Sequence, residues 1–383
     1  MYYNNFKDLK LSALGLGCMR LPCIDGDDSR PDQEQVNAMV DYAIANGINY
    51  FDTAWGYHNG NSEIVIGKAL ARYPRESFYL ASKFPGYDVS NFGKHEEIFE
   101  KQLEKCGVDY FDFYLFHNVA ELNIEQYLDD GISPLAYLVE QKKAGRIKHL
   151  GFSVHANQET FERFLEKYRG VCEFCQIQLN YLDYEFQDAR HKIETLTALG
   201  MPIWVMEGLR GGKLAKSCLG AEKILAKTRP DWTPANWGFG FLQSVPGVTM
   251  ILSGMSNMEQ LVQNTEFFGE RHILEDEEMG ALLTAAHFDT MGKDSGTVPC
   301  TGCRYCTSHC PMELDIPWLL SLYNEHKYSE GGFIAPMALE ALSEDRLPSA
   351  CIRCGFCAKV CPQKIDIPGT LEKFTELMKS TQE

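Results

Sequence analysis

The sequence predicts an α/β protein with two parts, a (β/α)8 barrel and a small, mainly helical C-terminal domain. The barrel prediction rests on eight short apolar runs that alternate with amphipathic stretches over about 250 residues. The small domain is indicated by the end of this alternation after Thr265 and by two cysteine runs of identical spacing. A length of 383 residues suits one large domain and one small one.

Each apolar run is short and is followed by a stretch with helical periodicity, as a strand–helix repeat requires. The predicted strands span residues 14–17, 49–53, 78–84, 111–117, 148–154, 174–180, 203–206 and 249–253. The predicted helices span residues 33–46, 62–70, 98–106, 134–143, 158–168, 188–199 and 258–263. Glycines 47, 107, 145 and 200 stand where a helix needs a left-handed end. A doubly wound open sheet is the alternative, but its Gly-x-Gly-x-x-Gly turn does not follow the first run.

The C-terminal part begins with one more predicted helix, residues 273–287, and a linker at residues 291–298. Between the two cysteine runs lie 40 residues with apolar segments at 317–323 and 335–342 and little strand signal. We therefore expect a barrel domain over residues 1–290 and a helical domain over residues 291–383.

The two cysteine runs predict iron–sulfur clusters. Both follow the pattern C-x-x-C-x-x-C-x-x-x-C-P, in which three thiolates hold one [4Fe–4S] cluster and the fourth ligates the other cluster. Zinc sites more often use two separated pairs of cysteines, and disulfides suit secreted proteins, so both alternatives fit less well. The crossed rule predicts two ligand sets, Cys300, Cys303, Cys306 and Cys361 for one cluster, and Cys351, Cys354, Cys357 and Cys310 for the other.

Composition narrows the classes of partner. The formal charge of −17 disfavours nucleic acid and anionic membranes as partners, and no apolar run approaches the length of a membrane span. The charge either steers a basic partner or only keeps the protein soluble, and the sequence leaves both readings open. Without a recognisable signal peptide, and with fourteen cysteines, the expected location is the cytoplasm.

Four polar residues follow the C-terminal ends of the predicted strands, where barrels of this kind build their active sites. They are Asp52, Tyr57, Lys83 and His117. A lysine beside a tyrosine favours the ionised phenol, and an aspartate orients and balances the lysine. A neutral histidine can donate a hydrogen bond to a carbonyl oxygen, so the set suits hydride delivery to a carbonyl carbon with Tyr57 as the acid.

The segments Phe51-Asp-Thr-Ala-Trp-Gly-Tyr57, Ser82-Lys83 and Phe116-His117 resemble the catalytic segments of the aldo-keto reductase superfamily. The resemblance covers about residues 8–270, and the cysteine tail resembles the ferredoxin-type module of an iron–sulfur branch of that superfamily. It implies the fold predicted above, Asp52, Tyr57, Lys83 and His117 as the catalytic tetrad, and a nicotinamide cofactor.

The resemblance also implies positions for that cofactor, with departures from the family pattern. Val154 replaces a common Asn, Met206 replaces a stacking Tyr, and residues 253–264 contain no Arg or Lys for a 2′-phosphate, so NAD and NADP both stay open. Arg210-Gly-Gly212 is suited to wrap a pyrophosphate. The implied cofactor positions are Ser153, Gln176, Met206, Arg210, Gly211, Ser253, Gly254, Ser256, Asn257, Gln260 and Asn264.

Two-electron hydride chemistry and one-electron clusters leave three hypotheses open. In the first, a nicotinamide-dependent reductase acts on a small carbonyl or alcohol, and a flavin such as FMN or a partner flavoprotein links it to the clusters. In the second, a ferredoxin supplies electrons to the clusters and the barrel reduces its substrate without nicotinamide. In the third, the protein is a nucleotide- or redox-sensing module. The loops at residues 85–93, 118–133 and 213–233 carry no substrate-specific motif.

Overall fold

The structure is a computed structural model of the whole chain, and it describes residues 1–186, 189–216, 221–291, 296–329 and 331–380. The chain divides into two compact units. The first unit comprises Met1–Ser217 and Asp231–Met279, and the second comprises Cys218–Pro230 and Gly280–Glu383.

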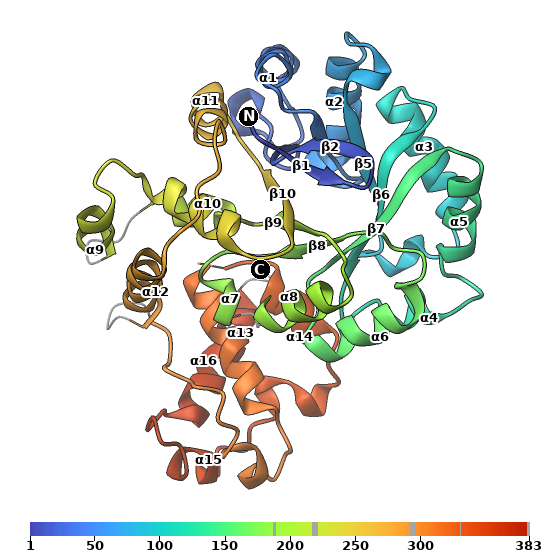
Figure 1. The fold of residues 1–383 in the computed structure, drawn as a ribbon. Coiled ribbons are helices and arrows are strands. Elements are labelled where there is room, and N and C mark those ends of the chain that lie inside the picture. Colours follow the sequence, from blue (N-terminus) through green and yellow to red (C-terminus); the bar gives the residue numbers. More distant parts are fainter. Residues whose placement is uncertain (187–188, 217–220, 292–295, 330, 381–383) are drawn as a thin grey trace. The chain divides into compact units, whose positions relative to one another are not determined.

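Eight parallel strands close into a barrel in the first unit (Figure 1), which confirms the predicted fold. Around the barrel the strands follow the order β10-β3-β4-β5-β6-β7-β8-β9. Each strand is therefore hydrogen-bonded to the barrel strands before and after it in the sequence, and β10 closes the barrel by pairing with β3. Their bounds are β3 Leu14–Gly17, β4 Tyr50–Asp52, β5 Tyr79–Phe84, β6 Phe111–Val119, β7 Ile147–Val154, β8 Cys175–Gln178, β9 Ile203–Met206 and β10 Val248–Ser253.

A hairpin that the sequence did not reveal packs against one end of this barrel. It pairs β1 (Tyr3–Phe6) with β2 (Leu9–Ser12) in antiparallel register. The Phe6 ring makes edge contacts with Phe174 and Trp204, at 6.1 and 5.1 Å between ring centroids. Phe6 and Leu11 belong to one buried cluster with Tyr50, Phe113 and Met250. The hairpin therefore covers one end of the barrel and is held there by buried aromatic side chains.

Helices follow the strands and surround the barrel (Figure 1). Their bounds are α1 Gln33–Ala45, α2 Ser62–Leu70, α3 His95–Cys106, α4 Ile124–Leu128, α5 Leu135–Lys143, α6 Gln158–Tyr168, α7 Asp183–Phe186, α8 Ala189–Ala198, α10 Pro234–Ser244 and α11 Met258–Phe267. Helices α4, α7 and α10 were not predicted, and Asp188, the predicted start of α8, lies outside the described residues. Gly107 ends α3 with a left-handed φ of 64°, as its position predicted.

The second unit is mainly helical, as predicted. It contains α9 Ala221–Thr228, α13 Ile316–Tyr328, α14 Ile334–Glu340, α15 Phe356–Lys359 and α16 Ile367–Ser380, while α12 (Asp276–Met291) runs from the first unit into the second. Part of the predicted linker, residues 292–295, lies outside the described residues. A buried cluster includes Leu319 and Tyr323 of α13, Ala335 of α14 and Leu371 and Phe374 of α16. The cysteine runs pack against this core.

The two cysteine runs have matching backbones. Left-handed residues recur 51 positions apart, at Gly302 and Arg353 (φ 68° and 58°), at Arg304 and Gly355 (61° and 74°), and at Glu313 and Lys364 (50° and 55°). Each run is followed by Asp-Ile-Pro at the start of a helix, α13 or α16. Because sequence spacing and chain path repeat together, the two runs are copies of one ligand-holding loop.

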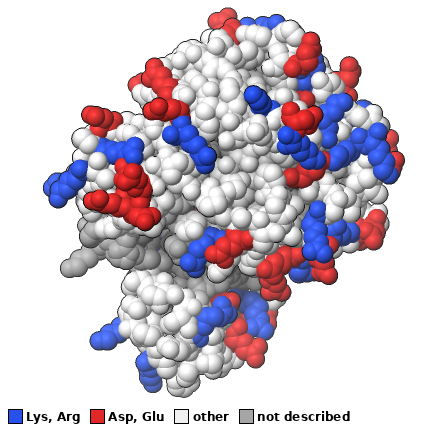
Figure 2. All heavy atoms as spheres, in the orientation of Figure 1, with Lys and Arg blue, Asp and Glu red and all other residues white. Residues whose placement is uncertain are grey.

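Among the described residues, no helix combines the length and the apolarity needed to cross a membrane. On the face drawn in Figure 2, Lys and Arg side chains are interspersed with Asp and Glu side chains. This face therefore offers no extended basic stripe of the kind that binds nucleic acid.

Candidate active site and cluster sites

Four neighbouring elements of the barrel carry the predicted tetrad. Asp52 ends β4, Tyr57 opens the short 3-10 turn Tyr57–Gly60 that follows, Lys83 lies near the end of β5, and His117 lies in β6. Because β4, β5 and β6 are adjacent in the barrel, their C-terminal ends bring these side chains together.

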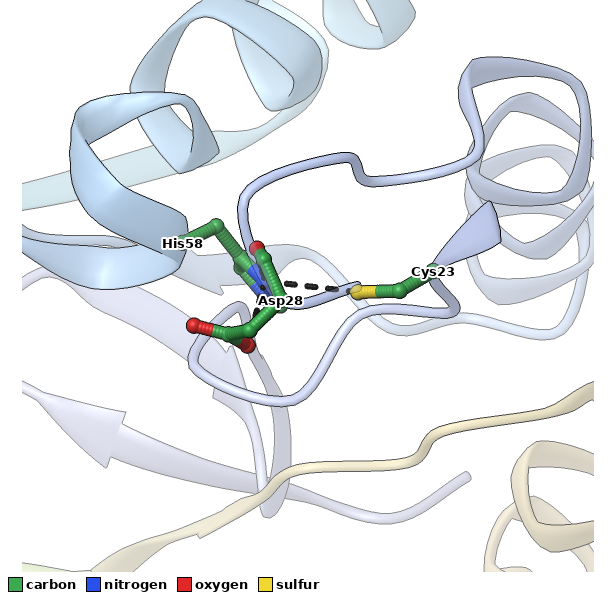
Figure 3. A group of neighbouring side chains, drawn as sticks. All are labelled: Cys23, Asp28 and His58. Atoms are coloured by element: carbon green, nitrogen blue, oxygen red, sulfur yellow. Dashed lines mark hydrogen bonds and ion pairs between the residues drawn. The ribbon is translucent and has the colours of Figure 1, made fainter. Parts of the chain in front are cut away.

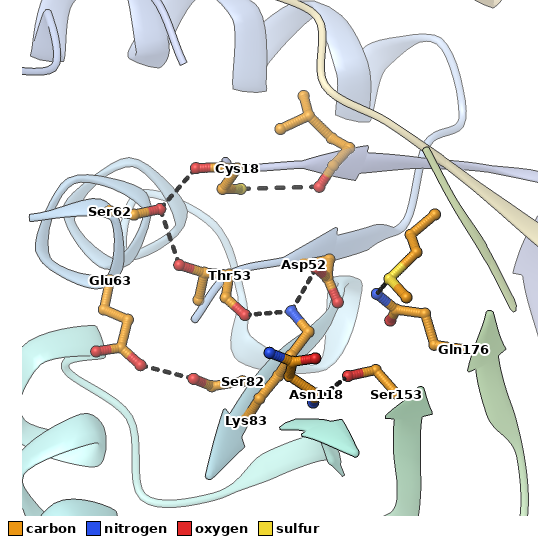
Figure 4. Close-up of polar contacts among 12 residues, drawn as sticks. Cys18, Asp52, Thr53, Ser62, Glu63, Ser82, Lys83, Asn118, Ser153 and Gln176 are labelled. Carbon is orange, nitrogen blue, oxygen red and sulfur yellow. Dashed lines mark hydrogen bonds and ion pairs between the residues drawn. The ribbon is translucent and has the colours of Figure 1, made fainter. Parts of the chain in front are cut away.

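A buried ion pair forms the centre of this group (Figure 4). Lys83 Nζ donates to Asp52 Oδ1 at 2.6 Å and to the carbonyl oxygen of Thr53 at 2.7 Å. Lys83 has no exposed surface and Asp52 is 3% exposed. Burial opposes the charge of Lys83, but Asp52 and Tyr57 outweigh burial, so the pKa of Lys83 lies above its ordinary value. Lys83 is therefore a fixed cation.

The Tyr57 ring lies beside this cation, and the His117 ring lies beside Tyr57. Lys83 Nζ is 5.0 Å from the centroid of the Tyr57 ring, and the Tyr57 and His117 rings meet edge to face at 6.1 Å. Burial raises the pKa of Tyr57, and the charge and hydrogen bond of Lys83 oppose this rise without cancelling it. Burial and then the charge of Lys83 hold the pKa of His117 well below its ordinary value. The group therefore contains a protonated phenol and a neutral imidazole at neutral pH.

The expectation that Lys83 would favour ionised Tyr57 describes only one of two opposing effects. Lys83 does act in that direction, but the loss of water around the phenol is larger. Tyr57 is accordingly protonated at neutral pH, and Lys83 only reduces the rise in its pKa.

A buried polar network that the sequence did not reveal is hydrogen-bonded to the backbone of Lys83. Glu63 of α2 accepts hydrogen bonds from Ser82 Oγ at 2.6 Å and from Gln102 Nε2 at 2.7 Å, and its other oxygen pairs with Lys105 at 2.6 Å. Gln102 also donates to the carbonyl oxygen of Lys83 at 3.0 Å. The only sequence signal for this network is an acidic residue on the buried face of α2.

A β-bulge gives the end of β6 its shape. The register between β6 and β7 shifts between Phe116 and Val119, and Asn118 has a left-handed φ of 56°. The Asn118 N–H donates to Ser153 Oγ at 2.8 Å, and Tyr127 OH donates to the carbonyl oxygen of His117 at 2.8 Å. These bonds fix His117, whose Nδ1 has no partner in the described part of the chain.

Two residues predicted to hold a nicotinamide carboxamide lie beside the tetrad's strands. Ser153 and Gln176 are neighbours in the register of β7 and β8, and both are buried. Gln176 Nε2 donates to the Met206 sulfur at 3.5 Å, whereas Gln176 Oε1 is buried without a partner among the described residues. The three side chains are therefore gathered at one place, and an amide oxygen is left to bind a ligand donor.

The loop after β9 carries Arg210 and Gly211, whose role toward a pyrophosphate stays a prediction. The Arg210 side chain is buried, and its Nη2 lies 3.5 Å from Asp183 Oδ1. Gly211 and Gly212 have left-handed φ values of 66° and 90°. Gly211 lies close to the Glu207 side chain, since a Cβ added at Gly211 would be 3.8 Å from Glu207 Oε2, and burial raises the pKa of Glu207. A guanidinium from another loop, that of Arg20, lies 3.8 Å from the same carboxylate.

The loop after β10 holds the remaining predicted positions. Asn257 caps α11 by accepting from the Gln260 N–H at 2.9 Å, and Gln260 Oε1 accepts from the Ser256 N–H at 2.8 Å. Asn264 Nδ2 donates to Ser253 Oγ at 3.2 Å. Gly254 and Ser256 are exposed. These side chains thus order the loop, and their role toward a cofactor stays a prediction.

In the second unit, the eight predicted cluster ligands line two separate hollows, four cysteines to each. Cys300, Cys303, Cys306 and Cys361 line one hollow, and Cys310, Cys351, Cys354 and Cys357 line the other. None of these eight cysteines forms a disulfide. The two quartets are those of the crossed rule, and four thiols around one hollow fit a [4Fe–4S] cluster.

A further group with metal-binding residue types lies beside Tyr57 (Figure 3). His58 Nδ1 is 3.5 Å from Cys23 Sγ and 3.0 Å from Asp28 Oδ1. His58 Nε2, however, accepts a hydrogen bond from the Leu21 N–H at 3.0 Å, so a neutral ring carries its proton on Nδ1. That proton points to the carbonyl oxygen of Asp28 at 2.9 Å. The imidazole therefore anchors the Tyr57 turn to the loop after β3, and its tautomer disfavours a metal.

Comparison with known protein families gives two matches along the chain. The model of the aldo/keto reductase family matches residues 13–285, and the model of the 4Fe-4S dicluster domain matches residues 299–365. The predicted division at residues 290 and 291 falls between these matches and stays a proposal.

Three curated proteins illustrate the similarity. Probable aldo-keto reductase 1 of Glycine max is 34% identical over 163 residues, which cover 40% of this chain and 44% of that protein. Uncharacterized oxidoreductase YqkF of Bacillus subtilis is 26% identical over 297 residues, 70% of this chain and 91% of that protein. NADH-specific methylglyoxal reductase of Escherichia coli is 28% identical over 196 residues, 46% of this chain and 57% of that protein. The chain thus spans less than two thirds of the first and third relatives.

Solved structures match the barrel. The thermostable aldo-keto reductase Tm1743 superposes with a TM-score of 0.60 at 23% identity, over 74% of this chain and all of that one. The aldo/keto reductase of Klebsiella pneumoniae in complex with NADP and acetate gives a TM-score of 0.58 at 20% identity, over 74% of this chain and 94% of that one. At these identities the likeness establishes the fold.

Proposed function

The chain belongs to the aldo/keto reductase family and is an oxidoreductase with a 4Fe-4S dicluster domain, and on this premise we propose that it reduces small carbonyl compounds with a nicotinamide cofactor. The observation that carries the proposal is the buried Lys83–Asp52 pair with Tyr57 and His117 beside it. A relative named NADH-specific methylglyoxal reductase and a neighbour solved with NADP support both the substrate class and the cofactor.

The residues divide the work of carbonyl reduction. When bound, the nicotinamide supplies a hydride to the carbonyl carbon. Neutral His117 donates a hydrogen bond to the carbonyl oxygen and polarises it. Tyr57 transfers its phenolic proton to that oxygen as the negative charge develops, which completes the alcohol. Lys83 stabilises the resulting phenolate, and Asp52 keeps Lys83 charged and in place.

The residues around this group fit the cofactor. Gln176 presents a buried amide oxygen that suits the carboxamide N–H group, and Ser153 lies next to it in the barrel. We propose these two for the carboxamide and the loops after β9 and β10 for the diphosphate. The relatives reported above give FMN no support, so a flavin enters this proposal only through a partner flavoprotein.

The cysteine quartets would hold two [4Fe–4S] clusters that pass single electrons. We propose Cys300, Cys303, Cys306 and Cys361 for one cluster and Cys310, Cys351, Cys354 and Cys357 for the other, because each quartet surrounds its own hollow. Electron exchange with a ferredoxin or a flavoprotein is the role that such clusters suit.

The test is a carbonyl screen with anaerobically purified protein, NADH and NADPH, comparing wild type with Tyr57→Phe and Tyr87→Phe. Tyr57→Phe should lower kcat about 10²- to 10⁴-fold, because the proton donor is lost while the ring remains. Tyr87 is the matched control, since its ring meets His117 at 5.4 Å without contacting Lys83 in the described contacts. Tyr87→Phe should stay within a few-fold of wild type.

Two outcomes would contradict the proposal. In the first, Tyr57→Phe reduces every substrate at the wild-type rate, which would remove Tyr57 from the chemistry. In the second, wild type turns over no carbonyl with either nucleotide but does so with reduced ferredoxin. That result would favour the second candidate, a ferredoxin-linked reductase, which the departures at Val154 and Met206 motivate. The family assignment favours either enzyme over a sensing module.

A further inference from the structure

Lys105 of α3 contacts the segment that carries Tyr57. Its Nζ donates to the carbonyl oxygen of Trp55 at 3.5 Å and lies 4.6 Å from the centroid of the Trp55 ring. A Cβ added at Gly60 would lie 3.8 Å from the same nitrogen. Trp55 precedes Tyr57 in the chain and Gly60 follows it. One ammonium group therefore meets the segment both before and after Tyr57.

A buried carboxylate fixes the place of this ammonium group. Lys105 Nζ pairs with Glu63 Oε2 at 2.6 Å, and the exposed fractions of the two side chains are 11% and 0%. The other carboxylate oxygen, Oε1, accepts hydrogen bonds from Ser82 Oγ at 2.6 Å and from Gln102 Nε2 at 2.7 Å. Charged hydrogen bonds on both oxygens hold the carboxylate in one orientation, because turning it would leave buried donors unpaired. Lys105 is therefore held at this position.

Gln102 lies one turn before Lys105 on the same face of α3. Its side chain is wholly buried, and its Nε2 donates to the carbonyl oxygen of Lys83 at 3.0 Å. One face of α3 thus contacts the strand that carries Lys83 and the turn that carries Tyr57. Glu63 joins these two contacts, because it is bonded to Gln102 through one oxygen and to Lys105 through the other.

The turn that carries Tyr57 depends on contacts outside itself. His58 and Asn59 have left-handed φ values of 53° and 52°, a conformation that is uncommon for residues other than glycine. His58 Nε2 accepts from the Leu21 N–H at 3.0 Å, which ties the turn to the loop after β3, and Lys105 ties it to α3. A turn held by one contact can rotate about it, whereas two contacts fix it. The place of the Tyr57 ring beside its cation therefore depends on both.

We propose that Lys105 is a positioning residue that holds the Tyr57 turn against Lys83, with Glu63 and Gln102 as its link to the Lys83 strand. The inference rests on the proposed function, since the geometry it sets is that between the proton donor and the cation of carbonyl reduction. A shift of about 1 Å in such a geometry can cost about 100-fold in rate. Loss of the ammonium group should therefore slow the chemical step and leave substrate binding nearly unchanged.

The test compares wild type, Lys105→Met and Lys105→Arg as anaerobically purified holoenzymes. Lys105→Met should lower kcat about 10- to 100-fold and keep KM for the carbonyl within about three-fold, because the turn loosens while the substrate contacts remain. Amide hydrogen exchange over residues 53–61, followed by mass spectrometry, should become about 10-fold faster, and exchange in β6 should stay unchanged. Lys105→Arg should keep kcat within about five-fold, since a guanidinium can pair with Glu63 and stack on Trp55.

Two further variants separate positioning from loss of the fold. Lys101→Met is the matched control, because Lys101 lies one turn earlier on α3, is 52% exposed and pairs with Glu104. It should leave kcat and exchange in the turn unchanged. Lys105→Met/Glu63→Gln removes both charges, so no buried carboxylate is left without its cation. This double variant should show the same lower kcat and faster exchange as Lys105→Met.

Exchange in the turn decides the inference. Unchanged exchange over residues 53–61 in Lys105→Met and in the double variant would overturn it even if kcat fell, because Lys105 would then act on the fold and not on the turn. Wild-type kcat in both variants would overturn it as well. If wild type reduces no carbonyl, the proposed function fails separately. Faster exchange in Lys105→Met would then keep Lys105 as the anchor of the turn, and unchanged exchange would remove it.

Discussion

The barrel site and the cysteine unit differ in whether their buried polar groups are paired within the polypeptide. In the barrel, Lys83 and Glu63 are wholly buried, and each has an oppositely charged partner within 2.6 Å. In the cysteine unit, eight thiols surround two hollows whose linings are otherwise largely apolar. The buried charges of the barrel site are therefore balanced by the polypeptide itself, whereas the thiols of the cysteine unit surround spaces that [4Fe–4S] clusters would fit.

This difference implies different dependences on cofactor. A preformed site of paired charges can bind and release a nucleotide without refolding, because the cost of burying its charges is offset by its own partners. A small unit whose loops converge on metal ligands gains much of its folding free energy from the metal. We expect the barrel to keep its fold without a ligand and the cysteine unit to depend on its clusters.

The largest expected effect tests the crossed ligation. Cys361→Ala removes a thiol from the hollow lined by Cys300, Cys303 and Cys306, so we expect it to lose the same cluster as Cys300→Ala. Iron should fall from about eight to about four atoms per chain in both variants, and their remaining cluster should give the same paramagnetic resonance spectrum. Cys310→Ala should instead match Cys351→Ala.

The crossed assignment would be contradicted if the spectra of the four variants matched in different pairs. If Cys361→Ala resembles Cys351→Ala, each run ligates its own cluster and the crossed assignment is wrong. Cys106→Ala is the control, because Cys106 is a buried thiol of α3, far along the chain from both runs. It should retain about eight iron atoms.

The next effect tests the paired charges of the barrel. Asp52→Asn leaves Lys83 buried without its carboxylate, so we expect the unfolding free energy of the barrel to fall by about 3–5 kcal/mol. Activity should be lost as well, because Lys83 no longer stays charged beside Tyr57. Urea unfolding followed by tryptophan fluorescence measures the first effect, and the carbonyl assay measures the second.

Asp112→Asn separates stability from chemistry. Asp112 is also buried, and it pairs with Arg75 at 2.7 Å away from the tetrad, near the start of β6. This variant should lose stability to a similar degree and keep most of its kcat. Equal loss of activity in both variants would mean that Asp52 acts only by holding the fold.

Sequence periodicity predicted most of the barrel because buried parallel strands leave a strong local signal. Two strands, residues 14–17 and 203–206, have the predicted bounds. The hairpin β1–β2 was missed because each strand has four residues and the turn contains Lys7, with a φ of 54°, in place of a glycine. Helix α10 was missed because two glycines and three aromatic residues conceal its helical tendency.

The four residues of the predicted tetrad could be singled out because three lie at or near strand ends and Tyr57 lies in the turn that follows β4. The predicted cluster ligands could be singled out because they are close in sequence. Contacts between distant loops leave no such mark. Arg20 meets Glu207 across 187 positions, and Glu63 meets Gln102 through a fold that must already exist. The pKa of Tyr57 likewise depends on how deeply the phenol is buried, which spacing does not reveal.

The smallest expected effect is the pH dependence of stability that comes from one buried histidine of the barrel, His155. Burial lowers the pKa of His155 to about 4, against about 6.5 for an unfolded chain. Because the folded pKa is the lower one, the unfolded state binds more protons below pH 6.5, and stability is lost as pH falls from 6.5 toward 4. Between pH 7 and pH 5 this histidine should account for about 2 kcal/mol of lost stability.

His155→Asn removes this contribution to the pH dependence of stability and shows whether it comes from the barrel. We expect the decrease in unfolding free energy between pH 7 and pH 5 to be about 2 kcal/mol smaller in the variant than in wild type. His155 lies in the first unit, and its substitution changes no cysteine of the second unit. The cluster iron content at pH 5 should therefore be the same in both proteins. An unchanged pH dependence would show that acid acts on the barrel through other groups, and a change in iron content would show that the two units do not respond separately.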